Sequence, residues 1–448
     1  MPALAERPDA PARRGWRAGL GDAGPLAFAG IVANGGSLIV TLVLARVLAV
    51  HDYGALNQLV GVFFVVSTPG SAVLVGVVRR VSRWPGRIED VGSWGAALHR
   101  RASSATLVFA VAVLAAGAQV ARLLGRHDPL AFDAVAIAGG VWVLLCIDRG
   151  LLQAHREYRV LSGNLLIEAG CRAACMIGFA AAGLGVTGVA AGVLVAELCT
   201  ALHARVIASR AWREQVRGLR PPGRATKTQW LGPWSDAWQR GARFGRDPSV
   251  RRDVFAAVGA LAALAVLQNI DVIVMGKEAP RAAGAYAAVS VSSKALVFVG
   301  MVVAGYLLPE AAMSWREGGH ALRQLAVALS VLALPALLLV AAAAAIPQVF
   351  LAAAFSRRYV SAAGAFLPLA LAMVCLSATV MVTMYLLGVG DRRFVGVLAG
   401  GALGATVAVV LANGVPRTTA LCDLVVQAAL LGGAVTELAR VHRRRAAS

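Results

Sequence analysis

The sequence predicts an all-α polytopic membrane protein with twelve transmembrane helices in two six-helix bundles. Of its 448 residues, 58% are hydrophobic and only 15% are charged, and the mean hydropathy is +0.71. The apolar runs are about twenty residues long, which is the length a helix needs to cross about 30 Å of hydrocarbon. The charges gather between these runs. The short alternating segments of a transmembrane barrel are not seen.

The expected spans form two sets of six, separated by one long basic interval. The first set is 25–45, 55–78, 102–121, 129–147, 160–183 and 185–204, and the second is 254–276, 282–308, 324–346, 362–388, 394–413 and 418–439. The predicted organisation is a tail at 1–24, a bundle at 25–204, a linker at 205–253, a bundle at 254–439 and a tail at 440–448.

The basic residues predict the orientation. Thirty-three of the 43 Lys and Arg fall in one set of loops and tails, eight in the opposite set, and two, Arg172 and Lys294, inside helices. Cytoplasmic loops carry such an excess. We therefore expect a multi-pass protein of the inner (cytoplasmic) membrane with both termini and the linker inside. The net charge of +20 then predicts anionic inner-leaflet lipids as partners of the linker, and no nucleic acid.

The linker holds twelve Lys or Arg and four tryptophans, Trp212, Trp230, Trp234 and Trp238. Short amphipathic helices lying on the inner leaflet would suit this composition, and so would a solvated loop. The interval is too short for an enzymatic domain.

No catalytic, nucleotide-binding or metal constellation is visible in the sequence. The six cysteines lie in apolar runs and the seven histidines lack ligand spacing, so we expect no metal site. A glycine-rich phosphate loop following a strand is missing. We predict a non-enzyme without a cofactor, in which Na⁺ or H⁺ could serve as a coupling ion.

A weak internal repeat relates the two halves. Leu44-Ala45-Arg46-Val47-Leu48 leads to Asp52-Tyr53-Gly54-Ala55, and Val272-Ile273-Val274-Met275-Gly276 leads to Ala283-Gly284-Ala285-Tyr286-Ala287. With six helices in each half, such a repeat would be parallel, as in one class of secondary transporters. Chance similarity between Ala- and Val-rich helices is the alternative.

At these hairpins the sequence resembles the polysaccharide-biosynthesis branch of the MOP exporter superfamily, whose fold is also that of the MATE transporters. The second match extends from Gln268-Asn269-Ile270-Asp271 to Leu308-Pro309-Glu310, and a weaker one is Arg149-Gly150-Leu151-Leu152-Gln153 with Tyr158 and Arg159. The resemblance implies two bundles around a central cavity and a polyprenyl-pyrophosphate-linked oligosaccharide as substrate. The murein-precursor flippases of this superfamily carry two further helices, for which this chain has no room.

Charged groups are costly at membrane depth and therefore informative. Asn164, Glu168 and Arg172 are spaced to share one face of the fifth span. They could form an ion pair that fixes this helix to a neighbour, or line the cavity so that Arg172 meets a pyrophosphate or sugar. Lys294 could pair with Asp271, Glu197 or Asp423, or bind a substrate phosphate.

Asp271 lies with Gln268 and Asn269 in the outer half of the seventh span. We predict coupling or gating for this group, with helix packing as the alternative. Pro69, Pro335 and Pro368 interrupt spans, which suits bending helices as well as static kinks.

The expected function is flipping of a lipid-linked oligosaccharide for cell-surface polysaccharide synthesis by alternating access. Arg172 and Lys294 would bind the anionic head in a net-cationic cavity, with Glu168 and Asn164 beside them. The alternatives are a multidrug/cation antiporter, a membrane oligosaccharide polymerase, and a scaffold for polysaccharide-assembly proteins. The chain could also work alongside such proteins as a flippase.

Overall fold

The computed structural model describes residues 16–82, 88–126, 128–155, 157–218, 248–316 and 321–447. Within them, twelve helices are long and apolar enough to cross a membrane, one for each expected span, which confirms the predicted fold class. The first half contains α1 (Trp16–Val47), α2 (Val50–Ser82), α3 (Ile88–Leu123), α4 (Pro129–Ala154), α5 (Tyr158–Ala181) and α6 (Gly185–Gly218). The second half contains α8 (Pro248–Glu278), α9 (Pro280–Arg316), α10 (Ala321–Ala345), α12 (Phe366–Val389), α13 (Arg393–Leu411) and α14 (Pro416–Ala447).

Several helices continue past the predicted spans because polar residues extend the same helix. The end of α6 and the start of α8 turn both ends of the expected 205–253 linker into helix. In the same way α14 takes in most of the expected C-terminal tail. The amphipathic helices predicted around Trp230, Trp234 and Trp238 lie outside the described residues.

One pair of elements was not predicted. The short helix α11 (Pro347–Ala354) and the 3₁₀ helix η2 (Arg357–Ala365) fold the connection between α10 and α12. Pro347 stands in the first turn of α11, where its missing N–H and fixed φ are tolerated. The matching connection in the first half, between α3 and α4, is only a few residues long. This insertion therefore makes the two halves unequal.

The same helix pairs pack together in each half, which supports the weak sequence repeat. In the first half the main contacts are α1 with α5, α2 with α4, α4 with α6, α5 with α6, and α3 with α4. The equivalent pairs in the second half are α8 with α13, α9 with α12, α12 with α14, α13 with α14, and α10 with α12. The order of equivalence follows the chain, as a parallel repeat requires.

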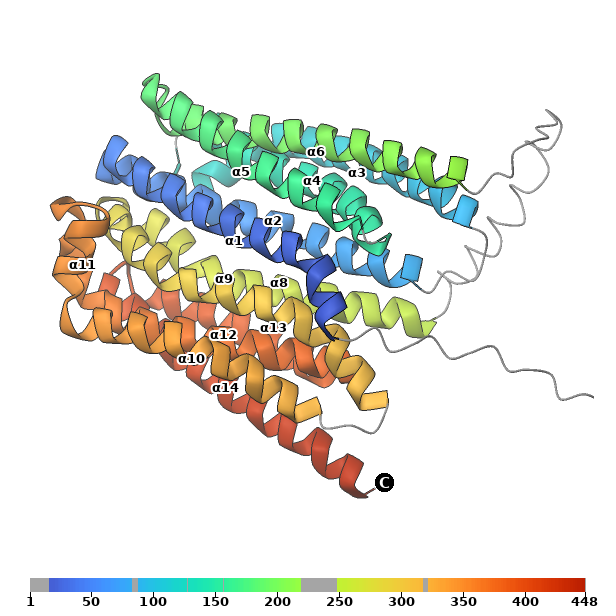
Figure 1. The fold of residues 1–448 in the computed structure, drawn as a ribbon. Helices are drawn as coiled ribbons and strands as arrows, with labels where there is room; N and C mark the ends of the chain where they lie inside the picture. The colour runs from blue at the N-terminus through green and yellow to red at the C-terminus, as the bar shows by residue number, and fades with distance from the viewer. Residues whose placement is uncertain are drawn as a thin grey trace, which may run out of the picture.

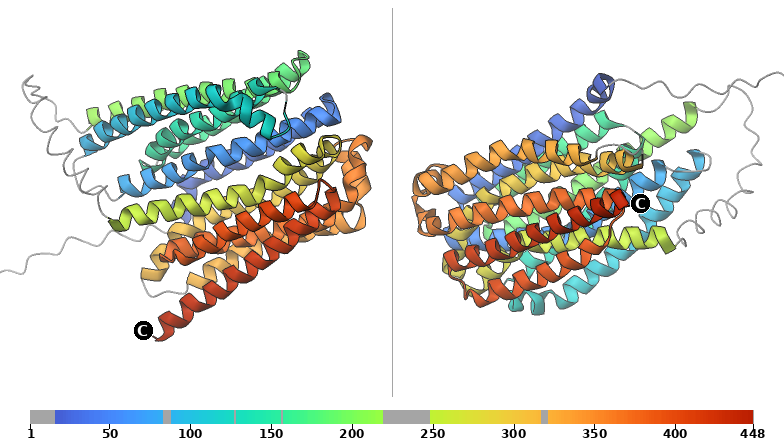
Figure 2. Two further views of the ribbon diagram at one scale, coloured as in Figure 1. Left: turned by 180° about the vertical axis from the view of Figure 1, so that it is seen from behind. Right: turned by 90° about the horizontal axis from the view of Figure 1, so that it is seen from below.

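The helices run side by side, so that the molecule has two distinct ends (Figures 1 and 2). The end of α6, the start of α8 and the C-terminus lie at one of them, called here the linker end. Helix α11 lies at the opposite end, called the α11 end. The described part of α1 also begins toward the linker end, as an even number of spans requires.

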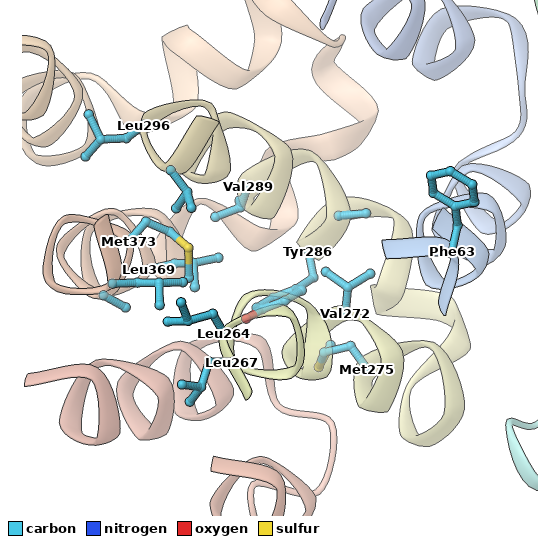
Figure 3. Close-up of a cluster of buried hydrophobic side chains, with 14 of the residues drawn as sticks. Phe63, Leu264, Leu267, Val272, Met275, Tyr286, Val289, Leu296, Leu369 and Met373 are labelled. Atoms are coloured by element: carbon cyan, nitrogen blue, oxygen red, sulfur yellow. The ribbon is translucent and has the colours of Figure 1, made fainter. Parts of the chain in front are cut away.

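Helix α2 makes most of the contact between the halves, packing along α8 and α9. The core of the second half lies behind this contact. There Tyr286 is surrounded by side chains of α8, α9 and α12 such as Leu264, Leu267 and Leu369, whereas Phe63 stands apart on α2 (Figure 3).

Candidate functional site

The first half encloses a cluster of polar side chains from α4, α5 and α6, which we call the N-half cluster: Arg149, Asn164, Glu168, Arg172 and Glu197. Asn164 and Glu197 are completely buried and Glu168 is 8% exposed. The side chain of Arg172 is 19% exposed. The spacing of the three α5 residues places them on one face, as the sequence predicted.

Ion pairs and one hydrogen bond connect the members of the N-half cluster. Glu168 accepts a hydrogen bond at each carboxylate oxygen, from Arg149 Nη2 at 2.7 Å and from Arg172 Nη2 at 2.8 Å. Arg172 also pairs with Glu197 on α6, and Arg149 Nε donates to Asn164 Oδ1 at 2.7 Å. Two guanidinium groups therefore face two carboxylates. This mutual compensation offsets much of the cost of burying four charges.

Arg172 keeps an unused donor. Its Nε is buried without a hydrogen-bond partner. The guanidinium carbon lies 5.7 Å from the centre of the Phe63 ring on α2, within the range of a cation–π contact. Arg172 thus extends from α5 toward the helix that packs against the second half. A partly exposed cation that is already oriented by two carboxylates is well placed to meet an anion.

Arg149 is the member that the sequence analysis missed, because it was counted as a loop residue after the span 129–147. The structure places it inside α4, only 4% exposed. The signal was present in the sequence, since Leu151 and Leu152 continue the apolar run on its far side. A basic residue with apolar residues on both sides fits a buried partner better than a loop.

The second half has its own buried polar group. Asp271 accepts three contacts from α9: Lys294 Nζ lies 3.1 Å from Oδ1, and Ser290 Oγ and the Tyr286 hydroxyl donate to Oδ2 at 3.1 and 3.2 Å. Asp271, Ser290 and Tyr286 are fully buried, and the Lys294 side chain is 9% exposed. Of the three partners proposed for Lys294, the structure selects Asp271.

Two residues of α14 extend this group. Gln427 Nε2 donates to the carbonyl of Leu267 at 3.2 Å and to Asp423 Oδ1 at 3.3 Å. Leu267 lies one helical turn before Asp271, and Asp423 is close enough to interact electrostatically with Asp271 and Lys294. Asp423 Oδ2 is buried without a hydrogen-bond partner. We call Asp271, Tyr286, Ser290, Lys294, Asp423 and Gln427 the C-half cluster. It contains two carboxylates and one ammonium.

The structure separates the three residues for which coupling or gating was predicted. Asp271 faces α9 and the C-half cluster. Asn269 faces α2, where a Cβ on Gly61 would lie 3.5 Å from its Cβ, and its amide nitrogen donates to Ala265 O at 2.9 Å. Gln268 is buried at 7% exposure. Residues two apart on a helix point to nearly opposite sides, so Asp271 and Asn269 face different neighbouring helices.

The four residues predicted to bind substrate are likewise divided between two clusters. Asn164, Glu168 and Arg172 belong to the first half, and Lys294 belongs to the second. Each cation is held by a carboxylate of its own half. The sequence predicted a net-cationic interior, and the structure corrects this, because the cations of both clusters are paired with carboxylates. The N-half cluster is neutral by formal charge, and the C-half cluster has one more carboxylate than cation. No group of three His, Cys, Asp or Glu with a metal-binding arrangement occurs among the described residues.

A set of contacts at the α11 end joins the two halves, and we call it the latch. The Tyr359 hydroxyl donates to Ala45 O at 2.6 Å, and Arg46 Nη2 donates to Ala353 O at 2.9 Å. The rings of Tyr53, Phe355 and Tyr359 pack edge-on or tilted, with centres 5.5 to 6.3 Å apart. The latch connects the α1–α2 turn to the insertion that only the second half contains.

Beyond the latch, α2 of the first half also makes close contacts with α8 and α9 of the second half. Gly54 packs against the backbone of Gly284, and Gln58 Nε2 donates to Ile273 O at 3.0 Å. Deeper along α2, the rings of Phe64 and Phe298 lie 6.0 Å apart. The structure is therefore closed between the halves at the α11 end.

Comparison with known proteins identifies the fold. Neither a family model nor a curated protein matches the chain. Solved structures do match. A multidrug-resistance MATE family transporter of the MOP superfamily, in an inward-facing conformation, superposes with a TM-score of 0.67 at 13% identity, over 94% of this chain and 99% of that one.

Two further solved structures share this fold. The lipid II flippase MurJ in an inward closed conformation superposes with a TM-score of 0.62 at 10% identity, over 92% of this chain and 87% of that one. A MOP superfamily transporter from Pyrococcus furiosus, described as having a binding pocket of reverse polarity, gives a TM-score of 0.54 at 12% identity, over 92% and 93%. The chain has the fold of membrane transporters and flippases.

Proposed function

We propose that this chain is a MOP-type flippase that moves a polyprenyl-pyrophosphate-linked oligosaccharide across the cytoplasmic membrane by alternating access. The basic residues at the linker end support a cytoplasmic location of that end, under the positive-inside rule. In this orientation the structure is the state closed to the outside. The head group would enter from the linker end while the prenyl tail stays in lipid.

The substrate proposal rests mainly on Arg172 and its unpaired donor. A guanidinium presents donors in a planar fork that fits phosphate oxygens. In Arg172 one side of this fork is fixed by Glu168 and Glu197, while Nε has no partner. A pyrophosphate could therefore bind without first displacing a carboxylate. Glu168 and Asn164 serve as positioning residues, because they hold Arg149 and Arg172 in place.

The C-half cluster suits ion coupling better than head-group binding. Lys294 is engaged with Asp271, and Asp423 has a buried oxygen without a partner. A second carboxylate in a dry site is stable only when it takes up a cation or a proton. We therefore propose that Asp271 and Asp423 together bind the coupling ion, and that Lys294 holds Asp271 in position.

The test is a translocation assay in proteoliposomes with a fluorescent, short-chain polyprenyl-pyrophosphate oligosaccharide. Arg172→Gln alone would leave the buried Glu197 without a cation, whereas Glu168 would keep Arg149. The informative variant is therefore Arg172→Gln with Glu197→Gln, which removes both charges of one pair. We expect at least a tenfold loss of translocation with unchanged elution as a folded monomer or oligomer. Arg440→Gln is the matched control, because Arg440 pairs only locally with Glu437 on α14. Full translocation by the double variant would refute the role of Arg172.

A multidrug/cation antiporter is the second candidate, and one observation favours it. The C-half cluster has more carboxylate than ammonium, which suits a cationic substrate. Efflux of a cationic dye from inverted vesicles distinguishes the two functions. Dye efflux that is lost in Asp271→Asn, together with absence of pyrophosphate-lipid translocation, would select the antiporter. No feature of the described residues favours the polymerase or the scaffold.

A further inference from the structure

A pocket of about 310 Å³ lies at the linker end of the first half. Its walls come from the start of α3, the end of α4 and the last turns of α6. The lining residues include Gly92, Ala96, Leu151, His155, Arg205 and Trp212. None of them belongs to either cluster or to the latch.

Small residues on two helices create this space. Gly92 and Ala96 lie one turn apart on α3, and Ala208 and Ala211 belong to the facing part of α6. Trp212 packs directly against the backbone of Gly92 and closes one side. The His155 ring lies 5.5 Å from the Trp212 ring. The result is an apolar pocket with an indole and an imidazole in its wall.

The polar groups of the pocket are mainly hydrogen-bond donors. Arg205 pairs with the buried Asp148 at 3.2 Å through Nη1, and its side chain is still 37% exposed. Arg213 is exposed, and its Nε donates to Ser209 O of the same helix at 3.1 Å. His155 Nε2 is buried without a hydrogen-bond partner. Glu157 is the acidic residue among the lining residues, and it is close enough to His155 to interact with it electrostatically.

Exposed apolar side chains lie farther along two of the helices that line the pocket. Along α3 the apolar side chains Leu107 and Val108 are 67% and 69% exposed, and along α6 Leu202 is 67% exposed. These residues lie on the same two helices, closer to the middle of the membrane than the pocket. An acyl chain resting there would bring a phosphodiester to the level of Arg205 and Arg213. Tryptophan is also a common residue at this interfacial depth.

We infer that this pocket binds the phosphodiester head group of an anionic phospholipid, with Arg205, Arg213 and His155 Nε2 as donors to the phosphate. Basic pockets between transmembrane helices at the cytoplasmic face are known lipid sites. A lipid bound here would tie α3, α4 and α6 together at their inner ends. The inference uses the proposed orientation only to choose the leaflet, and it holds whichever substrate the chain carries.

Binding is tested on the full-length protein in detergent, by native mass spectrometry with added phosphatidylglycerol, and with phosphatidylcholine for comparison. Arg213→Gln removes an exposed donor whose Nε lies against Ser209 O of its own helix. Ala96→Leu fills the pocket without changing charge. We expect phosphatidylglycerol to bind the wild type at least tenfold more tightly than either variant, and phosphatidylcholine to bind all forms weakly. Arg440→Gln is the control, since it removes one positive charge from α14, which does not line the pocket.

Three outcomes would overturn the proposal. Both variants could bind phosphatidylglycerol as tightly as the wild type. Phosphatidylcholine could bind as tightly as phosphatidylglycerol, which would show head-group-independent association. Glycerol phosphate could bind as tightly as the lipid, which would make the site one for a soluble phosphate. Because the readout is lipid occupancy, its failure would leave the transport proposal standing.

Discussion

The Tyr359 hydroxyl donates a 2.6 Å hydrogen bond to the carbonyl of Ala45, linking residues 314 positions apart and belonging to different halves. Both groups are buried. Ala45 lies near the end of α1, where carbonyls have no partner within the helix. The bond therefore satisfies a backbone group only while the α11 end is closed.

Tyr359→Phe should shift the protein toward the state open at the α11 end. Removing a buried hydrogen bond typically costs about 1 kcal/mol, which corresponds to a population change of roughly fivefold. Spin labels on His51→Cys and Val349→Cys, two exposed positions beside the latch, would report a longer-distance population in a background without other cysteines. Tyr385→Phe is the control, because its hydroxyl contacts His442 within the second half. An unchanged distance distribution in Tyr359→Phe would rule out the latch.

Lys294→Gln should destabilise the protein more than the double variant Lys294→Gln with Asp271→Asn. The single change leaves the fully buried Asp271 without its ammonium, and breaking a buried pair in this way costs about 3–5 kcal/mol. The double change removes both charges and keeps the shapes of the side chains. We expect thermal melting to show a clear drop for the single variant and substantial recovery for the double. Equal melting temperatures would mean that Asp271 and Lys294 are not coupled.

The fold could be predicted from the sequence, because the length of the apolar runs and the charges between them determine the number and limits of the spans. The Glu168–Arg172 pair was also predictable, since its partners are four residues apart on one helix. The remaining members of the clusters could not be found in this way. Glu197 and Asp423 meet their partners only through packing between helices, and no local spacing records that contact. The α11–η2 insertion was missed because a segment this short carries no span-length hydrophobic run.

Mild acid should weaken the linker end of the first half through His155. Burial lowers the pKa of His155, and the smaller effect of Glu157 raises it. A histidine whose folded-state pKa lies below its unfolded value of about 6.5 binds more protons when unfolded. Its contribution to stability is therefore complete above about pH 6.5 and is lost as the pH falls toward the folded-state pKa.

Melting curves of the wild type and His155→Gln between pH 7.5 and 5.5 measure this effect. We expect the wild type to lose more stability over this interval than the variant. The comparison is between slopes, so a uniform loss of stability in His155→Gln does not affect it. Parallel pH profiles would show that His155 does not titrate differently in the folded protein.

Gly284→Ala should also open the α11 end. It would act by steric overlap, whereas Tyr359→Phe acts by removing a hydrogen bond. A Cβ on Gly284 would overlap the carbonyl oxygen of Val50, and backbone atoms at this point belong to α2 and α9 of different halves. Backbone cannot turn aside as a flexible side chain can, so the two helices must separate. Gly404→Ala is the matched control, since a Cβ there meets open space. The same spin-label pair should show the longer distance in Gly284→Ala and the wild-type distance in Gly404→Ala. A wild-type distance in Gly284→Ala would mean that the α2–α9 contact yields locally, and that the hydrogen bonds of the latch alone hold the halves closed.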